Sequence, residues 1–234
     1  RRVAIRKVLK ACIRLVLSFI ADVKVEGLEN LPKEGPALLV GNHFSFLDPV
    51  AIIDAIPQPL EFFGGLRTPM APAWTNTFRQ AWGVLTVRRG SSSRDAILAG
   101  QQVLDQKGYV GIFPEGGSWA QVLRPPRPGA ALVAARSNAP LIPVGLDGWT
   151  EVFPLKLGRR ARVTVRIGQP FGPYNLDIRD RSSRGRLDEI GHEIMRKIGD
   201  LLPPERRGYY SDDPAIREAA KGTEVYPWAG MVEE

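Results

Sequence analysis

The alternation of short apolar segments with helical segments is the feature of this sequence that most restricts its fold. Apolar runs such as ALLVG, residues 37–41, are too short for buried helices and are typical of buried strands. Residues 49–56, which follow this run, have a helical pattern that a proline opens. Strands that alternate with helices build a sheet that helices cover, and most of its strands run parallel. We therefore expect an α/β fold with a mixed, largely parallel sheet covered by helices.

The elements expected from this alternation fill most of residues 23–202. The expected strands are 23–27, 37–41, 61–65, 84–89, 109–113, 139–146 and 161–168. The expected helices are 49–56, 71–82, 91–108, 129–138 and 184–202. A chain of 234 residues, of which 44% are hydrophobic, can bury a core of this size. We expect residues 23–202 to form one domain, followed by a proline-rich tail at 203–234 that is extended or partly helical.

Residues 1–22 differ from the rest of the chain in charge and pattern. Their apolar side chains recur at helical spacing, and residues 1–24 hold seven basic side chains against a single acidic one. A membrane-spanning helix needs about 20 consecutive apolar residues, and here the apolar run is interrupted by Arg6, Lys7, Lys10 and Arg14. We therefore expect an N-terminal amphipathic helix in the membrane interface, with its basic side chains against anionic lipid headgroups. The alternative is a helix that packs on the domain and exposes its basic face to solvent.

The remaining composition argues against several classes of site. Cys12 is the only cysteine, so the chain forms no internal disulfide, which fits a reducing, intracellular setting. With two histidines and one cysteine, we expect no metal site. The strand expected at 161–168 is basic, but its charged and apolar residues alternate as in a half-exposed strand, so we expect no nucleic-acid partner. His192 falls within an expected amphipathic helix, where we expect a structural role.

The segment GNHFSFLDPVAII, residues 41–53, contains the other histidine. His43 and Asp48 are five residues apart, which is about 500° of rotation along a helix, so they cannot face each other within one helix. They can meet on a turn between a strand that ends at Gly41 and a helix that Pro49 opens. Asp48 could then orient the imidazole of His43 as a general base and also cap the helix. An H-x4-D match arises by chance in about one chain in ten, so packing and capping without catalysis are the alternative.

A second polar loop, IFPEGGSW at residues 112–119, follows the expected strand 109–113. Gly116 and Gly117 allow backbone amides to approach a ligand closely, so these amides are candidates for stabilising an oxyanion. The carboxylate of Glu115, in the same loop, could hold a polar acceptor. An ordinary β-turn is the alternative interpretation of this loop.

Four short blocks follow one another in a fixed order along the chain. They are NHxxxxD at 42–48, GVLTVRR at 83–89, FPEG at 113–116 and IPV at 142–144. The series resembles the glycerolipid acyltransferase family, whose best-known members are the 1-acylglycerol-3-phosphate acyltransferases. The resemblance covers roughly residues 23–170. The chain contains no G-x-S-x-G elbow, phosphate-binding GxxxxGK[ST] loop or GxGxxG fingerprint that would point to another chemistry.

The resemblance implies roles for residues of the first two blocks. In the family, the histidine and the aspartate of the first block act as general base and orienting partner, here His43 and Asp48. The arginine that ends the second block is thought to bind the phosphate of the acceptor, which suits the forked donors of arginine. This implies an acceptor site that contains Arg89, with Arg88 beside it.

The third block departs from the family pattern. It commonly reads FPEGTRS, whereas Gly117 and Ser118 stand here in place of the threonine and the arginine. One expected phosphate ligand is therefore missing. Arg127 fits a later basic position of the family and joins the expected acceptor site, to which Arg124 could add charge. Together with Glu115 and Gly116, these residues complete the expected site.

The resemblance implies an enzyme that moves a fatty acyl group from acyl-CoA or acyl-carrier protein to a hydroxyl of a lysophospholipid or related glycerolipid. It implies phospholipid biosynthesis and requires neither a metal nor a redox cofactor. With the N-terminal helix, we expect a peripheral or monotopic membrane protein on the cytoplasmic face. Two alternatives stay open, a non-catalytic membrane- or anion-binding module on the same fold and an acyl-thioester hydrolase.

Overall fold

Seven strands form a sheet in the order β1-β7-β6-β2-β5-β3-β4. The computed structural model describes residues 2–65, 71–87, 94–155, 158–176, 183–225 and 227. The strands are β1 (Ala21–Glu26), β2 (Ala37–Gly41), β3 (Leu60–Gly65), β4 (Leu85–Val87), β5 (Tyr109–Ile112), β6 (Leu141–Asp147) and β7 (Ala161–Ile167). Neighbouring strands are parallel except for the antiparallel pair of β6 and β7. The expected mixed, largely parallel sheet is confirmed.

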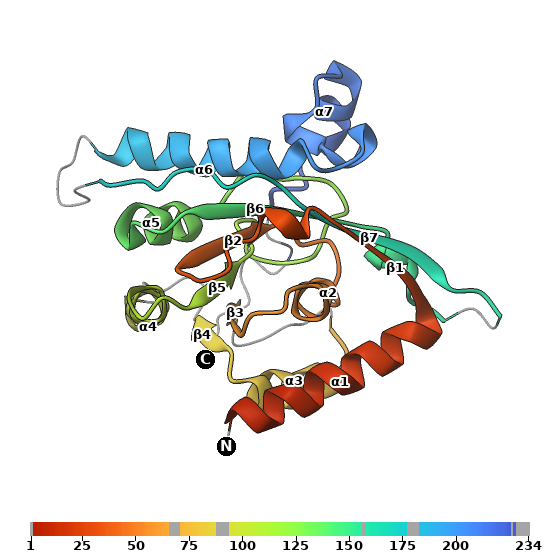
Figure 1. Ribbon diagram of the computed structural model, residues 1–234. Helices are drawn as coiled ribbons and strands as arrows, with labels where there is room; N and C mark the ends of the chain where they lie inside the picture. Colours follow the sequence, from red (N-terminus) through yellow and green to blue (C-terminus); the bar gives the residue numbers. More distant parts are fainter. Residues whose placement is uncertain are drawn as a thin grey trace.

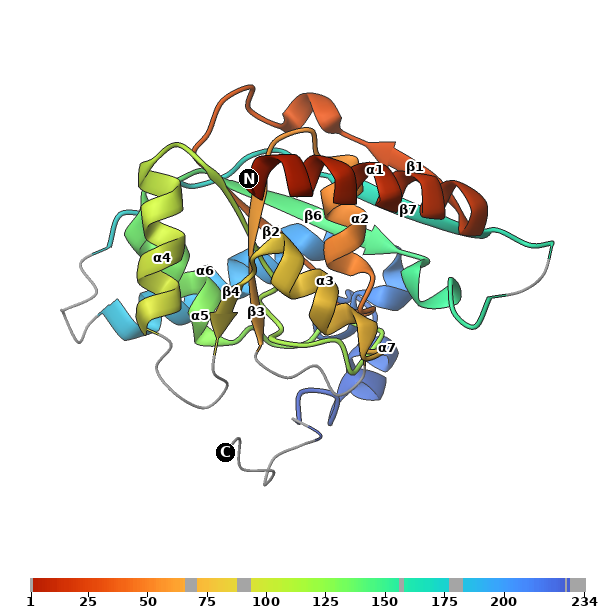
Figure 2. The same cartoon turned by 90° about the horizontal axis from the view of Figure 1, so that it is seen from below.

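Helices cover both faces of the sheet (Figures 1 and 2). One face carries α1 (Arg2–Ile20), α2 (Asp48–Ala55) and α3 (Trp74–Trp82), and the other carries α4 (Arg94–Asp105), α5 (Pro128–Ser137) and α6 (Ser183–Gly199). The hydrophobic core accordingly has two parts. Ile13, Ile52 and Trp82 belong to the first part, and Leu104, Val133 and Ile194 belong to the second. The expected helices are present, and their bounds differ from the expected ones by a few residues.

The C-terminal segment is partly helical, as expected. It contains the short helices η3 (Pro204–Arg206), η4 (Gly208–Tyr210) and α7 (Pro214–Ala220), while η1 (Leu28–Asn30) and η2 (Trp149–Glu151) occur earlier in the chain. The segment lies against the loop that precedes α5. There the amide of Leu123 donates to the carbonyl of Arg206 at 3.0 Å, and its carbonyl accepts from the amide of Tyr209 at 3.1 Å.

β2 and β5 are neighbours at the centre of the sheet, and the chain leaves them on opposite faces. After β2 the chain enters α2, and after β5 it enters α5 on the other face. In α/β proteins, ligands bind at the carboxyl ends of the strands beside such a change of direction. His43 follows β2 and Glu115 follows β5, so both residues lie at this edge of the sheet.

Three basic side chains of α1 contact the domain. Arg6 forms a bidentate ion pair with Glu61 of β3, with N–O distances of 2.6 and 2.7 Å. Lys10 donates to the carbonyl of Ile56, and Arg14 donates to Asp54 at 3.1 Å. The expected contact with lipid headgroups is therefore wrong for Arg6 and Lys10. The helix packs on the domain, as in the alternative, and the Arg14 side chain is 68% exposed to solvent. The physical reason is that β3 and α2 present carboxylates and a carbonyl toward the helix.

The opposite side of α1 is apolar and exposed. Its large exposed side chains are Val3, Ile5, Val8, Leu15, Val16 and Phe19. Trp74 of α3 and Phe153 are also exposed, and both contact Phe46, which packs against the first part of the core. No helix among the described residues has the length and apolar character to cross a membrane.

We expect the mostly buried ion pair of Arg6 and Glu61 to hold α1 on the sheet. Arg6→Met and Glu61→Gln should each lower the free energy of unfolding by about 1–2 kcal/mol, and their double-mutant cycle should give a favourable coupling. Urea unfolding followed by circular dichroism measures both quantities. The exposed pair Arg186–Glu189 of α6 is the control and should give a smaller coupling. Equal couplings would contradict the inward orientation of the basic side of α1.

Candidate active site

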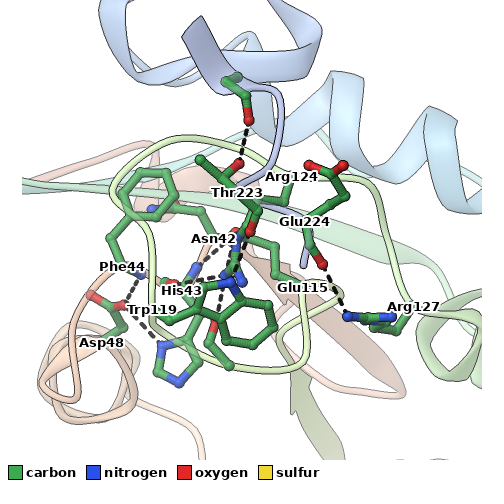
Figure 3. Close-up of polar contacts among 12 residues, drawn as sticks. Asn42, His43, Phe44, Asp48, Glu115, Trp119, Arg124, Arg127, Thr223 and Glu224 are labelled. Carbon is green, nitrogen blue, oxygen red and sulfur yellow. Dashed lines mark hydrogen bonds and ion pairs between the residues drawn. The ribbon is translucent and has the colours of Figure 1, made fainter. Parts of the chain in front are cut away.

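A single carboxylate oxygen closes the turn between β2 and α2 (Figure 3). Oδ2 of Asp48 lies 3.0 Å from Nδ1 of His43. The same oxygen accepts the backbone N–H groups of Phe44 and Ser45, both at 2.7 Å. The expectation that His43 and Asp48 meet on a strand-to-helix turn is therefore confirmed.

Asp48 does not cap α2, although we expected it to do so. Leu47 is the N-cap, whose apolar side chain accepts no hydrogen bond from the helix, and Asp48 is already the first helical residue, followed by Pro49. The physical reason is that the turn before the helix supplies three donors to the Asp48 carboxylate. Burial raises the pKa of Asp48, while the hydrogen bonds from His43 and from the turn amides lower it.

The ring of His43 is held in one orientation and keeps one nitrogen for chemistry. A carboxylate only accepts hydrogen bonds, so Nδ1 of His43 carries the proton and Nε2 is the acceptor. The ring stacks on Phe113, with centroids 4.3 Å apart and an angle of 20° between the planes. The side chain is 17% exposed, which leaves it accessible from one side. The arrangement can therefore accept a proton at Nε2 from a bound hydroxyl group.

Asn42 fixes the peptide that precedes His43. It is fully buried, its Nδ2 donates to the carbonyl of Leu146 at 2.8 Å, and its Oδ1 accepts the amide of Leu146 at 2.7 Å. These two bonds continue the pairing of β2 with β6 beyond the last backbone pair, Gly41 with Val144. Sequence reasoning did not select Asn42. A polar residue directly after a wholly apolar strand was the available signal.

Glu115 is buried and both of its oxygens are occupied. Oε2 lies 2.7 Å from the guanidinium of Arg124, and Oε1 accepts the backbone N–H of His43 at 2.9 Å. In the structure both oxygens of Glu115 are thus paired within the protein and Arg124 is engaged with it, while contact of either residue with the acceptor stays a prediction. Burial raises the pKa of Glu115 to about 7, an effect that the Arg124 guanidinium opposes.

The two glycines of the loop differ in what their amides can do. Gly116 has a φ of 78°, and its amide donates to the carbonyl of Phe113 at 3.1 Å, which removes it as an oxyanion donor. Gly117 accepts a hydrogen bond from Arg124 at its carbonyl. Within the described residues, the amide of Gly117 has no acceptor, so it stays a candidate for the oxyanion site.

Of the three arginines expected to bind phosphate, the structure describes Arg127. Arg127 is the N-cap of α5 and is exposed, and its Nη2 donates to the carbonyl of Glu224 at 3.2 Å. Figure 3 shows its guanidinium pointing toward Glu224 and away from His43. Arg88 and Arg89 lie outside the described residues. They directly follow β4, whose carboxyl end lies at the same sheet edge as that of β5, because β3 runs parallel to both.

The model of the family described as Acyltransferase matches residues 22–147, more than half of the chain. The chain belongs to the acyltransferase family. This finding confirms the resemblance that the four blocks indicated, and it makes the protein an enzyme that transfers acyl groups.

Named relatives and a solved structure agree with this assignment. A 1-acyl-sn-glycerol-3-phosphate acyltransferase of Bacillus subtilis (strain 168) is 23% identical to the acyltransferase over 190 residues, which are 81% of this chain and 92% of that protein. A protein of the same name from Borreliella burgdorferi is 29% identical over 156 residues, 62% of this chain and 59% of the relative. The crystal structure of the 1-acyl-sn-glycerophosphate acyltransferase PlsC from Thermotoga maritima superposes with a TM-score of 0.61 at 21% identity. It covers 86% of this chain and 80% of its own, which shows the shared fold.

The second histidine of the acyltransferase has a structural setting. Nδ1 of His192 on α6 lies 2.8 Å from the hydroxyl of Tyr210 on η4, so the pair joins the C-terminal segment to the domain. The described residues contain no group of three or more His, Cys, Asp and Glu side chains that could hold a metal ion.

We expect Asn42→Ala to destabilise the acyltransferase strongly. It leaves the buried N–H and C=O of Leu146 without partners, which should cost about 2–4 kcal/mol of unfolding free energy in urea titrations. Asn30→Ala is the matched control, since Asn30 also donates to a strand carbonyl, that of Ile167, but is partly exposed. A loss of unfolding free energy no larger than that of Asn30→Ala would argue against the role of Asn42 in joining β2 to β6.

Proposed function

We propose that this acyltransferase moves a fatty acyl group from the thioester of acyl-CoA or acyl-carrier protein to the hydroxyl of a lysophospholipid. The first acceptor to test is 1-acylglycerol 3-phosphate, because the named relatives are acyltransferases for it. The observation that carries the proposal is the contact of 3.0 Å between His43 and buried Asp48 at the carboxyl edge of the sheet. A neutral imidazole held by a carboxylate suits removal of a hydroxyl proton near neutral pH.

In the proposed reaction, His43 acts first as base and then as acid. Its Nε2 takes the proton of the acceptor hydroxyl while the oxygen forms a bond to the thioester carbonyl carbon. Asp48 keeps the ring in place and stabilises the imidazolium that forms. The carbon–sulfur bond then breaks, and the imidazolium returns its proton to the departing thiolate. The atoms and charges of this direct transfer balance without an acyl-enzyme, a metal or a redox cofactor.

The negative charge that develops on the carbonyl oxygen of the thioester needs a hydrogen-bond donor to stabilise it. The amide of Gly117 is the candidate donor in this loop, because the amide of Gly116 already donates to the carbonyl of Phe113. A fixed backbone donor of this kind stabilises the charge without reorganising during the reaction. The carbonyl of Gly117 is itself held by Arg124, which fixes the orientation of this part of the loop.

For the acceptor phosphate, we propose binding by Arg88, Arg89 and Arg127. Arginine side chains pair with phosphate through two parallel hydrogen bonds, which fixes both distance and direction. Arg127 is exposed and would exchange its bond to the Glu224 carbonyl for one to phosphate.

The test of the proposed chemistry compares the two histidines of the chain. His43→Ala removes the base and should lower kcat at least 10²-fold, because general bases contribute about 10²–10⁴. His192→Ala is the matched control and should leave the kcat of the folded enzyme unchanged. The measurement is thiol release from acyl-CoA with a panel of lysolipids that includes lysophosphatidic acid, with the products identified by mass spectrometry. Full activity of His43→Ala would falsify the assignment of the base, and thiol release without an acceptor would indicate a hydrolase.

We further propose that the exposed apolar side of α1 binds the enzyme to the membrane surface, on the cytoplasmic face. Six large apolar side chains of α1 are exposed, and Trp74 and Phe153, which contact Phe46 on the same face, add exposed apolar surface. Apolar side chains that lie in the interface contribute in proportion to their buried area. Since Arg6, Lys10 and Arg14 contact the domain, anionic headgroups have a secondary role at this helix.

The two sides of α1 predict different responses to substitution. Leu15→Asp and Phe19→Asp should each reduce binding to vesicles of phosphatidylcholine and phosphatidylglycerol several-fold, because each places a charge in the apolar interface. Lys7→Gln, a charge change on the same helix, should have little effect. Sedimentation with vesicles at low and high salt measures both. Strong loss with Lys7→Gln, or strong salt dependence, would point to headgroup attraction instead.

A further inference from the structure

A buried arginine outside the four motif blocks contacts the peptide of His43. We propose that Arg124 is a positioning residue, which holds this peptide in the orientation that the base needs. This role rests on the proposed function of His43 and adds a residue that the motif series does not contain. Ser118 stands where the family commonly has an arginine, and Arg124 reaches the same loop from six positions further along the chain.

Burial makes the pair of Arg124 and Glu115 hard to separate. The two side chains are 1% and 0% exposed, Nη2 lies 2.7 Å from Oε2, and Nε donates to the same oxygen at 2.8 Å. Charges are stable in a protein interior only when they are paired and hydrogen-bonded, and removal of one partner leaves the other uncompensated. The pair therefore forms a rigid unit in the protein interior.

This unit binds both polar groups of the His43 backbone. Oε1 of Glu115 accepts the N–H of His43 at 2.9 Å, and Nη2 of Arg124 donates to the carbonyl of His43 at 3.4 Å. The orientation of the His43 backbone fixes where the imidazole begins, and Asp48 then fixes its rotation. The base is thus held from two sides, by Asp48 at the ring and by the ion pair at the peptide.

The guanidinium of Arg124 lies over the indole ring of Trp119. The centre of the guanidinium lies 3.8 Å from the centroid of the indole ring, and Nε1 of Trp119 donates to the carbonyl of Thr223 at 2.8 Å (Figure 3). Arg124 also donates to the carbonyl of Gly117. A lysine has neither the planar group that stacks on an indole nor the fork of donors that serves several acceptors. The site therefore requires arginine and not only a positive charge.

A direct contact between Arg124 and the substrate is the competing role. Nη1 of Arg124 is buried and has no partner among the described residues, which is the observation in favour of a contact with an anionic substrate group. The two roles differ in their kinetic effect. A substrate ligand changes KM of the acceptor, whereas a residue that positions the base changes kcat.

The test uses the full chain with Arg124→Lys, and Arg206→Lys as the matched control. Arg206 also contacts this loop, at the carbonyl of Gln121, but is partly exposed. We expect Arg124→Lys to lower kcat at least tenfold with KM of acceptor and donor unchanged, since a small displacement of a catalytic group is costly in rate. Arg206→Lys should change neither constant. A rise in the acceptor KM with unchanged kcat would overturn the positioning role.

A readout that does not depend on activity separates this inference from the proposed function. The chain has two histidines, so ¹H–¹⁵N spectra of the imidazole rings contain two sets of signals. Arg124→Lys should shift the His43 signals and leave those of His192 in place. Unchanged His43 signals would refute the positioning role even if His43→Ala abolished activity. If Arg124→Lys does not fold, Trp119→Leu removes the stacking and the bond to Thr223 while the ion pair stays, and it should shift the same signals.

Discussion

The site depends on one buried oxygen, Oδ2 of Asp48. It accepts the ring N–H of His43 and the backbone N–H groups of Phe44 and Ser45, and no solvent reaches it to compete. The same three bonds make the tight turn that ends β2, start α2 and set the tautomer of the base. Loss of the carboxylate would therefore disturb the backbone of the turn and the chemistry of the ring together.

Three central strands contribute to holding this turn. Asn42 ties it to β6 through Leu146, and Glu115 ties it to the loop after β5 through the N–H of His43. β2 itself lies between β5 and β6, so the peptide of His43 is fixed on both sides at the point where the chain changes faces of the sheet. A base held in this way loses little orientational freedom when substrate binds, which favours catalysis.

α1 shows how the domain assigns the two sides of an amphipathic helix. Carboxylates and a carbonyl on β3 and α2 bind Arg6, Lys10 and Arg14, and six large apolar side chains of the helix are left at the surface. An ordinary surface helix buries its apolar stripe and exposes its polar side, whereas α1 buries Ile13 and Leu17 and exposes a second apolar side. The exposed apolar surface lies on the sheet face of α1–α3, which gives the enzyme one face suited to lipid.

Local pattern determined the strands, the helices and the turn of His43, because periodicity and the five-residue spacing are properties of neighbouring residues. The ordered blocks determined the family for the same reason. Tertiary structure alone decided the partners of Glu115, the clamp made by Asn42 and the side of α1 that faces inward. Each of these depends on groups far apart in the chain, such as Asn42 and Leu146 or Arg6 and Glu61. Whether a buried charge is a ligand for substrate or a support for the base depends on which opposite charge the fold brings beside it.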